Sequence, residues 1–246
     1  MDCEYQCIND LFSLKNERAF VTGKVGLLAP VWKETLENAG AEVRMYGLPE
    51  DDVRDRDKLF KIAETYTPDI LLNNCAIDNP PTSKATFFGN AKEILEVNLF
   101  GANNVCEAFI PKMIENGGGV IVFIGSIQGY GGSDYRNYPP DFEKPIAYGE
   151  SKAAYRNMAR QIAVQYGRYG IRAVTPSFSA YNGGKLKQEF LEKFLKNVPL
   201  RKQGYTELID QCISKKSLQQ TLLYAICCED LTGQDWRVDG GLNSWA

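Results

Sequence analysis

The sequence predicts an α/β protein with one doubly wound parallel sheet in a single domain. Short apolar runs alternate with longer helix-like stretches, which is typical of parallel strands joined by crossover helices. Gly119–Ile124 is apolar throughout, as expected of a parallel strand buried on both faces. The chain has 246 residues, enough for one sizeable core, and no repeat or low-complexity linker divides it.

The first half of the chain alternates between predicted strands and predicted helices. The predicted strands are Ala19–Thr22, Glu42–Tyr46 and Asp69–Leu72. The predicted helices are Val31–Ala39, which Gly40 ends as a C-cap, and Asp57–Tyr66, which Pro68 ends.

The second half continues the pattern around one long helix. The expected elements are a helix over Ala91–Glu115 that is interrupted or bent near Asn98–Gly101 and Pro111, the strand Gly119–Ile124, a helix over Ile146–Tyr169, and strands over Ile171–Thr175 and Trp236–Asp239. A Tyr- and Pro-rich insert, residues 129–145, precedes the second helix. In such sheets ligands bind beyond the carboxyl ends of the strands, so we expect the functional residues there.

The composition excludes several kinds of functional site. The chain contains no histidine, which excludes Ser-His-Asp and Cys-His catalytic sites within the chain and any histidine-ligated metal. Seven cysteines include no C-x-x-C pair, which disfavours zinc and iron–sulfur sites. The net charge of −3 provides no basic field for nucleic acid. Acid–base chemistry therefore falls to Tyr, Lys, Asp, Glu or Cys.

The sequence also indicates where the protein works. No apolar run approaches the roughly 20 residues that a membrane helix needs. Residues 1–17, which we interpret as an N-terminal extension, lack the apolar centre of a secretory signal. We therefore expect a soluble cytoplasmic protein with reduced thiols and no membrane partner.

Tyr148 and Lys152 form the first candidate site. They lie four residues apart on a predicted helix and so share a face. A nearby ammonium group favours phenolate and would lower the tyrosine pKa from about 10, creating a general acid–base without histidine. Among thirteen tyrosines a chance match is a strong alternative, and Tyr181 with Lys185 matches as well, although glycines between them argue against a helix.

Two further polar residues fit the same site. Ser126 follows the most hydrophobic strand, where its hydroxyl would emerge at the carboxyl edge of the sheet and hold a substrate carbonyl group. Asn98 is a polar residue within an apolar helix and could tether water or backbone near a lysine. The alternatives are an ordinary polar strand end for Ser126 and a helix-bend residue for Asn98.

A glycine-bearing turn lies between the first predicted strand and helix. Thr22–Ala29 reads TGKVGLLA, and such a turn brings backbone N–H groups and a helix N-terminus to a phosphate. The pattern is weaker than the usual fingerprint, because Ala29 stands where a third glycine is expected. Asp52–Val53 and Leu72–Ala76 could line an adenosine pocket, or could be plain strand ends and turns.

The whole chain resembles the short-chain dehydrogenase/reductase family from Leu11 to the C-terminus. The resemblance is carried, in this order, by TGKVGLLA, DV, NNCA, VNLFG, IGS, YGESK, IRAVTPS and TGQDWRVDGG. It implies a Rossmann-like fold and a homo-oligomer, either a dimer or a tetramer. NNCAID, the closing VDGGLNSW and the long spacing between Ser126 and Tyr148 are similar to members linked to bacterial surface and flagellar sugar biosynthesis.

The resemblance also implies residue roles. Ser126 would orient the carbonyl group, Tyr148 would move the proton, Lys152 would lower the tyrosine pKa and hold the nicotinamide ribose, and Asn98 would support a proton relay. Further contacts to NAD or NADP would come from Gly23, Leu27, Leu28, Asp52, Val53, Asn74, Ala76 and Ser179.

The sequence departs from the family pattern in its nucleotide-binding half. About one helix–strand unit is missing between Thr22 and Asn73, and Gly47 stands about where an acidic residue would meet the adenosine ribose. Two hypotheses therefore stand. The first is an NAD(P)-dependent oxidoreductase that interconverts a hydroxyl and a carbonyl group on a small polar, sugar-like substrate. The alternative is a related fold that has lost dinucleotide binding and acts as a non-redox enzyme or as a regulatory or assembly subunit.

Overall fold

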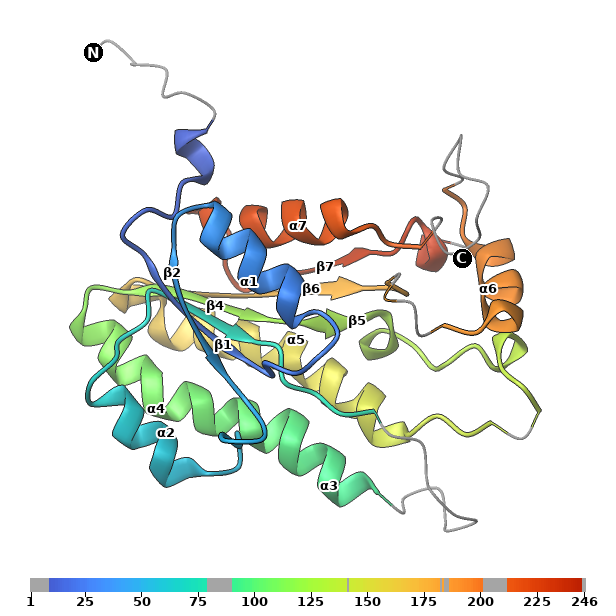
Figure 1. Cartoon of the computed structure of the whole chain (residues 1–246), viewed down its shortest axis with the longest axis horizontal. Coiled ribbons are helices and arrows are strands. Elements are labelled where there is room, and N and C mark those ends of the chain that lie inside the picture. Colours follow the sequence, from blue (N-terminus) through green and yellow to red (C-terminus); the bar gives the residue numbers. More distant parts are fainter. Residues whose placement is uncertain are drawn as a thin grey trace.

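The chain folds around one parallel sheet, seen from the side in Figure 1. The structure is a computed structural model that describes residues 9–78, 90–140, 142–181, 183, 186–200 and 212–244. Its strands are β1 (Arg18–Thr22), β2 (Glu42–Tyr46), β3 (Ile70–Asn73), β4 (Gly119–Phe123), β5 (Gly125–Ser126), β6 (Ile171–Phe178) and β7 (Asp235–Val238). The order across the sheet is β2-β1-β3-β4-β6-β7, and the short β5 pairs with the last residues of β6.

Helices cover both faces of the sheet, as the doubly wound prediction requires. On one face lie α1 (Ala29–Asn38) and α7 (Lys215–Cys227). On the other lie α2 (Arg56–Ala63), α4 (Gly101–Glu115) and α5 (Ile146–Tyr166), with α3 (Ala91–Leu95) leading into α4. The short helix α6 (Gln188–Phe194) lies beyond the carboxyl ends of β5 and β6 (Figure 1).

One hydrophobic core lies between the sheet and the helices on each of its faces. Alternate side chains of each strand point to opposite faces, so neighbouring residues enter different cores. Phe20 packs with α2, α4 and α5, whereas Val21 packs with α1 and α7. Because both faces of the central strands β3 and β4 are buried, these strands read as apolar runs in the sequence.

The nucleotide-binding half is short, as the sequence predicts. A single strand, β2, lies outside β1, and β3 pairs directly with β1 on the other side. The chain from β1 to β3 contains only α1, β2 and α2. This confirms the prediction that about one helix–strand unit is missing from this half.

The long helix predicted over Ala91–Glu115 is divided by a change of helix type. After α3, residues Glu96–Phe100 form a π-helical turn, and α4 starts at Gly101. A Cβ on Gly101 would lie 2.5 Å from Cγ2 of Val53, so a glycine is needed where α4 crosses the loop after β2. The π turn overlaps the interruption that the sequence predicts at Asn98–Gly101, whereas α4 continues through Pro111.

Candidate functional site

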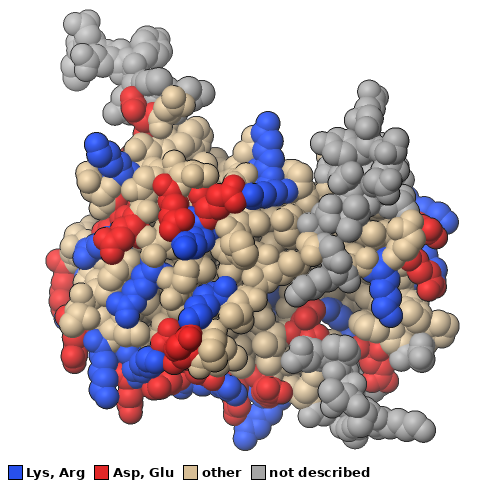
Figure 2. Space-filling model, in the orientation of Figure 1, with Lys and Arg blue, Asp and Glu red and all other residues tan. Residues whose placement is uncertain are grey.

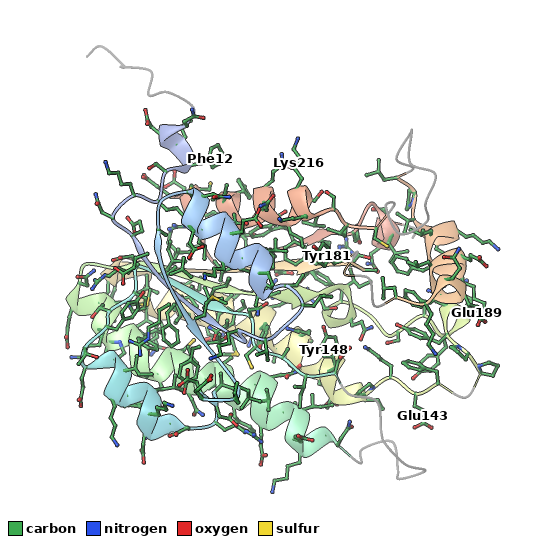
Figure 3. The ribbon with its side chains drawn as sticks, viewed as in Figure 1. Phe12, Glu143, Tyr148, Tyr181, Glu189 and Lys216 are labelled. Atoms are coloured by element: carbon green, nitrogen blue, oxygen red, sulfur yellow. The ribbon has the colours of Figure 1, made fainter. Side chains whose placement is uncertain are left out.

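Three elements bring together four residues that we call the catalytic cluster: Asn98, Ser126, Tyr148 and Lys152. Asn98 lies in the π turn, Ser126 ends β5, and Tyr148 and Lys152 lie in the first turns of α5. Figure 3 shows Tyr148 inside the molecule, while Glu143 and Glu189 lie at its periphery. The cluster forms at the carboxyl edge of the sheet, where the strand pattern places ligand sites.

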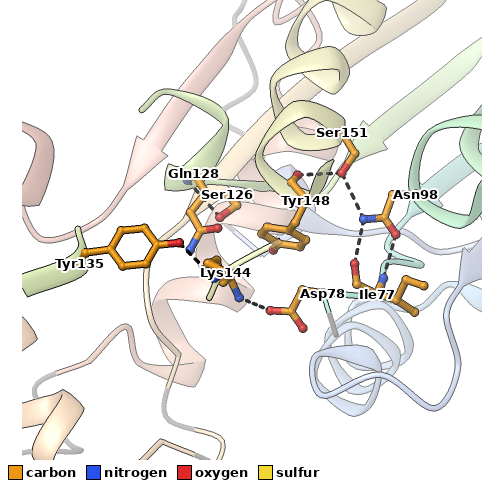
Figure 4. A network of polar contacts seen from close by, with 9 residues as sticks. All are labelled: Ile77, Asp78, Asn98, Ser126, Gln128, Tyr135, Lys144, Tyr148 and Ser151. Carbon is orange, nitrogen blue, oxygen red and sulfur yellow. Dashed lines mark hydrogen bonds and ion pairs between the residues drawn. The ribbon is translucent and has the colours of Figure 1, made fainter. Parts of the chain in front are cut away.

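Asn98 is completely buried and joins two segments of the chain (Figure 4). Its Oδ1 accepts a 2.8 Å hydrogen bond from the N–H of Ile77, and its Nδ2 donates to the Ile77 carbonyl at 3.0 Å. Nδ2 also donates to Oγ of Ser151 at 3.1 Å, and that hydroxyl donates to the carbonyl of Tyr148 at 2.8 Å. Asn98 therefore fixes the loop after β3 against the start of α5.

Lys152 is buried beneath Tyr148. Its side chain donates a 2.7 Å hydrogen bond from Nζ to the carbonyl of Ile124, between β4 and β5. Nζ also lies 4.7 Å from the ring centre of Tyr155 and 5.7 Å from that of Tyr148. Burial disfavours the charged form and lowers the pKa of Lys152 to about 8.

The phenol of Tyr148 faces Ser126. The side chain of Ser126 lies close enough to the phenol to lower its pKa, and Oγ of Ser126 accepts a hydrogen bond from the N–H of Gln128 at 3.2 Å. Burial, and next the carboxylate of Asp78, raise the pKa of Tyr148 to about 12, and the nearby hydroxyl of Ser126 opposes this rise. The structure thus differs from the expectation of a lowered tyrosine pKa, because burial outweighs an ammonium group that lies below the ring and is itself poorly solvated.

Several residues of the site escaped the sequence interpretation. Tyr155 donates from its hydroxyl to the carbonyl of Asn98 at 2.6 Å, and Ser151 bridges Asn98 and Tyr148. Both lie on the face of α5 that carries Tyr148, three and seven residues after it, so helical spacing could have found them. Asp78 and Lys144 also lie close to Tyr148. They belong to loops, which have no periodic sequence pattern that could have predicted their positions.

The glycine-bearing turn after β1 packs closely against the loop after β3. Gly23 has a positive φ of 79°, and a Cβ there would lie 2.8 Å from Cα of Cys75. Its N–H donates to the carbonyl of Tyr46 at 2.7 Å. The side chain of Asn74 bridges this turn to α1, since its Oδ1 accepts from Nε1 of Trp32 at 2.8 Å and its Nδ2 donates to the carbonyl of Thr22 at 3.0 Å.

Leu27 and Leu28 end the turn. Leu28 is the residue before α1, and Leu27 is 41% exposed. Leu27 meets the loop after β6, because a Cβ on Gly183 would lie 2.4 Å from Cδ1 of Leu27. The two loops therefore touch across the turn.

The remaining predicted nucleotide contacts are dispersed. The carboxylate of Asp52 pairs with Arg54, Val53 is buried against α4, and Ala76 is exposed at the carboxyl edge. Ser179 follows β6, and its buried Oγ has no hydrogen-bond partner among the described residues. This serine lines a cavity of about 100 Å³ near α6 and β7.

Within the described ranges there is no group of three or more potential metal ligands. None of the described helices is long and apolar enough to cross a membrane. Five cysteines lie in the described ranges and all carry free thiols: Cys75, Cys106, Cys212, Cys227 and Cys228. Basic and acidic side chains are interspersed on the face shown in Figure 2.

Solved structures share this fold over nearly the whole chain. A gluconate 5-dehydrogenase from Burkholderia cenocepacia, in complex with NADP and tartrate, superposes with a TM-score of 0.77 at 21% identity and covers 97% of this chain and 99% of its own. A short chain dehydrogenase from Leptospira borgpetersenii with bound NAD+ gives a TM-score of 0.82 at 21% identity, covering 96% of each chain.

Sequence relatives and a family model give the same placement. A 7alpha-hydroxysteroid dehydrogenase from Paraclostridium sordellii is 34% identical over 71% of this chain, a match that spans 62% of the relative's length. One from Clostridium sardiniense is 35% identical over 81% of this chain and 86% of its own. The family model for short chain dehydrogenases matches residues 28–182, more than half of the sequence. The chain therefore belongs to the short-chain dehydrogenase family.

Proposed function

We propose that the protein is an NAD(P)-dependent oxidoreductase that interconverts a hydroxyl and a carbonyl group on a small polar, sugar-like substrate. The observation that carries this proposal is the grouping of the Ser126 hydroxyl and the Tyr148 phenol above the buried Lys152. These three groups, from β5 and α5, provide a donor for the carbonyl oxygen, a proton donor and a cation to stabilise the resulting phenolate.

The side chains divide the proton chemistry as follows. A phenol with a pKa of about 12 is protonated at neutral pH, so Tyr148 is ready to give its proton to a carbonyl oxygen that Ser126 orients. The ammonium of Lys152 then stabilises the phenolate left behind. In the opposite direction the phenolate would accept the proton of the hydroxyl group. No imidazole is needed, in keeping with a chain that has no histidine.

The residues at the carboxyl edge fit a nicotinamide dinucleotide in two places. At the turn after β1, the N–H of Gly23 donates to a backbone carbonyl. A pyrophosphate would therefore meet the N–H groups of Leu27 and Leu28, just before α1. Beside Phe178, which pairs with Ser126, the buried hydroxyl of Ser179 has no hydrogen-bond partner among the described residues and would be available to the nicotinamide. The dinucleotide would supply or accept the hydride, and Gly23, Leu27, Leu28, Asn74, Lys152 and Ser179 would hold it, with Asp52, Val53 and Ala76 towards adenosine.

The relatives support hydroxyl–carbonyl chemistry on a range of substrates. The two relatives named above are hydroxysteroid dehydrogenases, and one solved structure is a gluconate dehydrogenase that carries NADP. Their names favour neither a single substrate nor one of the two dinucleotides for this chain. We also propose that the protein is cytoplasmic and forms a homo-oligomer. Light scattering of the purified protein would measure its number of subunits.

The decisive experiment measures dinucleotide binding and turnover together. NADH and NADPH are titrated by calorimetry, and the protein is then assayed with a panel of polyhydroxy and keto compounds. We expect binding of at least one dinucleotide and turnover that falls by about a thousandfold in Tyr148→Phe, because that variant loses the proton donor. Unchanged binding in the same variant shows that its fold is intact. No binding of either dinucleotide at millimolar concentration would overturn the proposal.

One observation favours the alternative of a fold without dinucleotide. Leu27, one of the residues that would face the pyrophosphate, contacts the backbone at Gly183, and on this alternative the contact would have to open for a pyrophosphate to enter. If the contact is permanent, the same catalytic cluster would serve non-redox chemistry or the protein would act as a subunit. Leu27→Gly separates the two cases, since it should strengthen dinucleotide binding only if Leu27 obstructs the site.

A further inference from the structure

Lys144 and Asp78 form an ion pair beside Tyr148, at the edge of the catalytic cluster (Figure 4). Lys144 belongs to the segment before α5, and Asp78 to the loop after β3. Nζ of Lys144 lies 5.0 Å from the ring centre of Tyr148. A substrate that brings a carbonyl group to Tyr148 and Ser126 must therefore pass close to this pair.

Lys144 is the firmly held member of the pair. Its backbone N–H donates to the hydroxyl of Tyr135 at 3.1 Å, and its side chain is only 14% exposed. Further support comes from aromatic packing, since Tyr138 stacks on Phe142 with ring centres 4.6 Å apart and contacts Phe190 of α6. The ammonium group is thus preorganised beside the phenol.

Asp78 is the exchangeable member. Its side chain is 53% exposed, and the described contacts of its carboxylate are with Lys144 alone. A pair of this exposure contributes about 0–1 kcal/mol, so its rupture costs little. Asn98 binds both the N–H and the carbonyl of Ile77, the residue before Asp78, so the backbone is held up to that point. The side chain can therefore turn to solvent without disturbing the cluster.

The charges around Tyr148 show what would replace Asp78. Ammonium groups of Lys144 and Lys152 lie 5.0 and 5.7 Å from the ring centre of Tyr148. When Asp78 swings away, a preorganised cation faces the site without its carboxylate. Asp78 itself shows which group fits Lys144, because the pair joins a carboxylate to this ammonium.

We propose that the substrate carries a carboxylate group that displaces Asp78 and binds Lys144 while its carbonyl or hydroxyl group lies at Tyr148. This inference rests on the proposed function, because it assigns a charged group to the substrate of that reaction. Lys144 is then a specificity-determining residue, and Asp78 is an internal competitor that holds the ammonium in place until the substrate arrives.

The test compares an acid with its neutral amide. Gluconate and gluconamide share one polyhydroxy skeleton and differ in the charged group. Both are titrated by calorimetry into the wild-type protein and three variants, with and without NADH, so that no turnover is needed. The variants are Lys144→Met, Asp78→Asn and the matched control Lys215→Met, which breaks another exposed lysine–carboxylate pair, with Glu34, on the α1–α7 face.

We expect the wild-type protein to prefer gluconate, and Lys144→Met to weaken gluconate binding by about tenfold because it removes a charge-assisted hydrogen bond. Gluconamide binding should change less than about twofold, the expected limit when no charged contact is lost. Asp78→Asn should strengthen gluconate binding by about threefold, since the competing state of Lys144 disappears. Lys215→Met should change neither.

Two results would overturn the inference. One is a wild-type protein that shows no preference for gluconate over gluconamide under either condition. The other is a Lys144→Met variant that keeps the preference while Asp78→Asn leaves it unchanged. The proposed function fails separately, through absent dinucleotide binding in the preceding experiment, because the ligand preference is read without hydride transfer.

Discussion

The catalytic cluster and the nucleotide-binding half hold their polar side chains in different ways. In the cluster, Asn98 and Lys152 are buried, and each binds the backbone of a segment distant in sequence. In the nucleotide-binding half, Asp52 pairs with Arg54 two residues away, and Lys24 pairs with the exposed Glu50. The first arrangement is buried and depends on the whole fold, whereas these two ion pairs are exposed to solvent.

This difference indicates that the catalytic cluster is the more rigid of the two regions. A buried polar group without its partners costs free energy, so the cluster persists only while all its segments are in place. Exposed ion pairs contribute little and tolerate replacement. What the nucleotide-binding half cannot replace is backbone shape, above all at Gly23. The following predictions test this contrast.

The largest effect is expected at Lys152. Lys152→Met should lower kcat/KM for carbonyl reduction by about a hundredfold, because the phenolate of Tyr148 loses its cation. The lowered pKa of about 8 adds a pH dependence, since the ammonium is present below that value and is lost as the pH rises through it. Wild-type reduction should therefore decline above pH 8 in a rate profile. A flat profile to pH 10 would contradict this role.

A large effect is also expected at Gly23, in the otherwise tolerant half. Gly23→Ala places a methyl group 2.8 Å from Cα of Cys75 at a φ of 79°, which should cost about 2–3 kcal/mol of unfolding free energy. Urea unfolding measures this cost. Gly117→Ala is a matched control with respect to φ, because Gly117 has a φ of 100° but nothing within 4 Å of its added Cβ. Equal losses in the two variants would show that strain in φ, and not the close approach, sets the cost.

A smaller effect is expected at Tyr155. Tyr155→Phe removes the 2.6 Å hydrogen bond to the carbonyl of Asn98 but keeps the ring beside Lys152. We expect a loss of about 1–2 kcal/mol in unfolding free energy, because a buried acceptor loses its donor. Tyr155→Leu, which also removes the ring, should cost more and shift the pH profile of Lys152. Identical profiles in both variants would rule out an influence of the ring on Lys152.

The smallest effect is expected at Asp52. Asp52→Asn breaks the exposed pair with Arg54 and should change the unfolding free energy by less than about 0.5 kcal/mol. Dinucleotide affinity, followed by fluorescence titration, should change less than about twofold if the adenosine end is held mainly by backbone. A tenfold loss of affinity would show that this carboxylate contributes directly, and the contrast between the two regions would then be weaker.

The sequence predicted the strands of the sheet more completely than the later helices. Glu42–Tyr46 has the predicted bounds, because polar and apolar residues alternate along this partly exposed edge strand. Strand β6 continues to Phe178, beyond the predicted Thr175, since pairing with β5 and β7 supports its last residues. Helices α6 and α7 were not predicted. Their apolar residues are explained only by the folded structure, in which α7 packs on the sheet and α6 packs on the insert.

The same distinction applies to the candidate site. Tyr148 and Lys152 follow from i, i+4 spacing, and Ser126 from its place after an apolar strand, because both signals are local. The partners Asp78 and Lys144 come from separate loops that only the folded chain brings together. The prediction of a lowered tyrosine pKa failed for a related reason, since burial is decided by packing that the sequence does not display.

By itself, the sequence determined a doubly wound parallel sheet, a shortened nucleotide-binding half and the exclusion of histidine from any chemistry of this chain. These follow from periodicity, chain length and residue type, which are properties of the chain in one dimension. Only the tertiary structure decided which groups are desolvated and which loops meet at Tyr148. Both depend on long-range packing, and a charge beside a buried phenol has its effect only once water has been excluded.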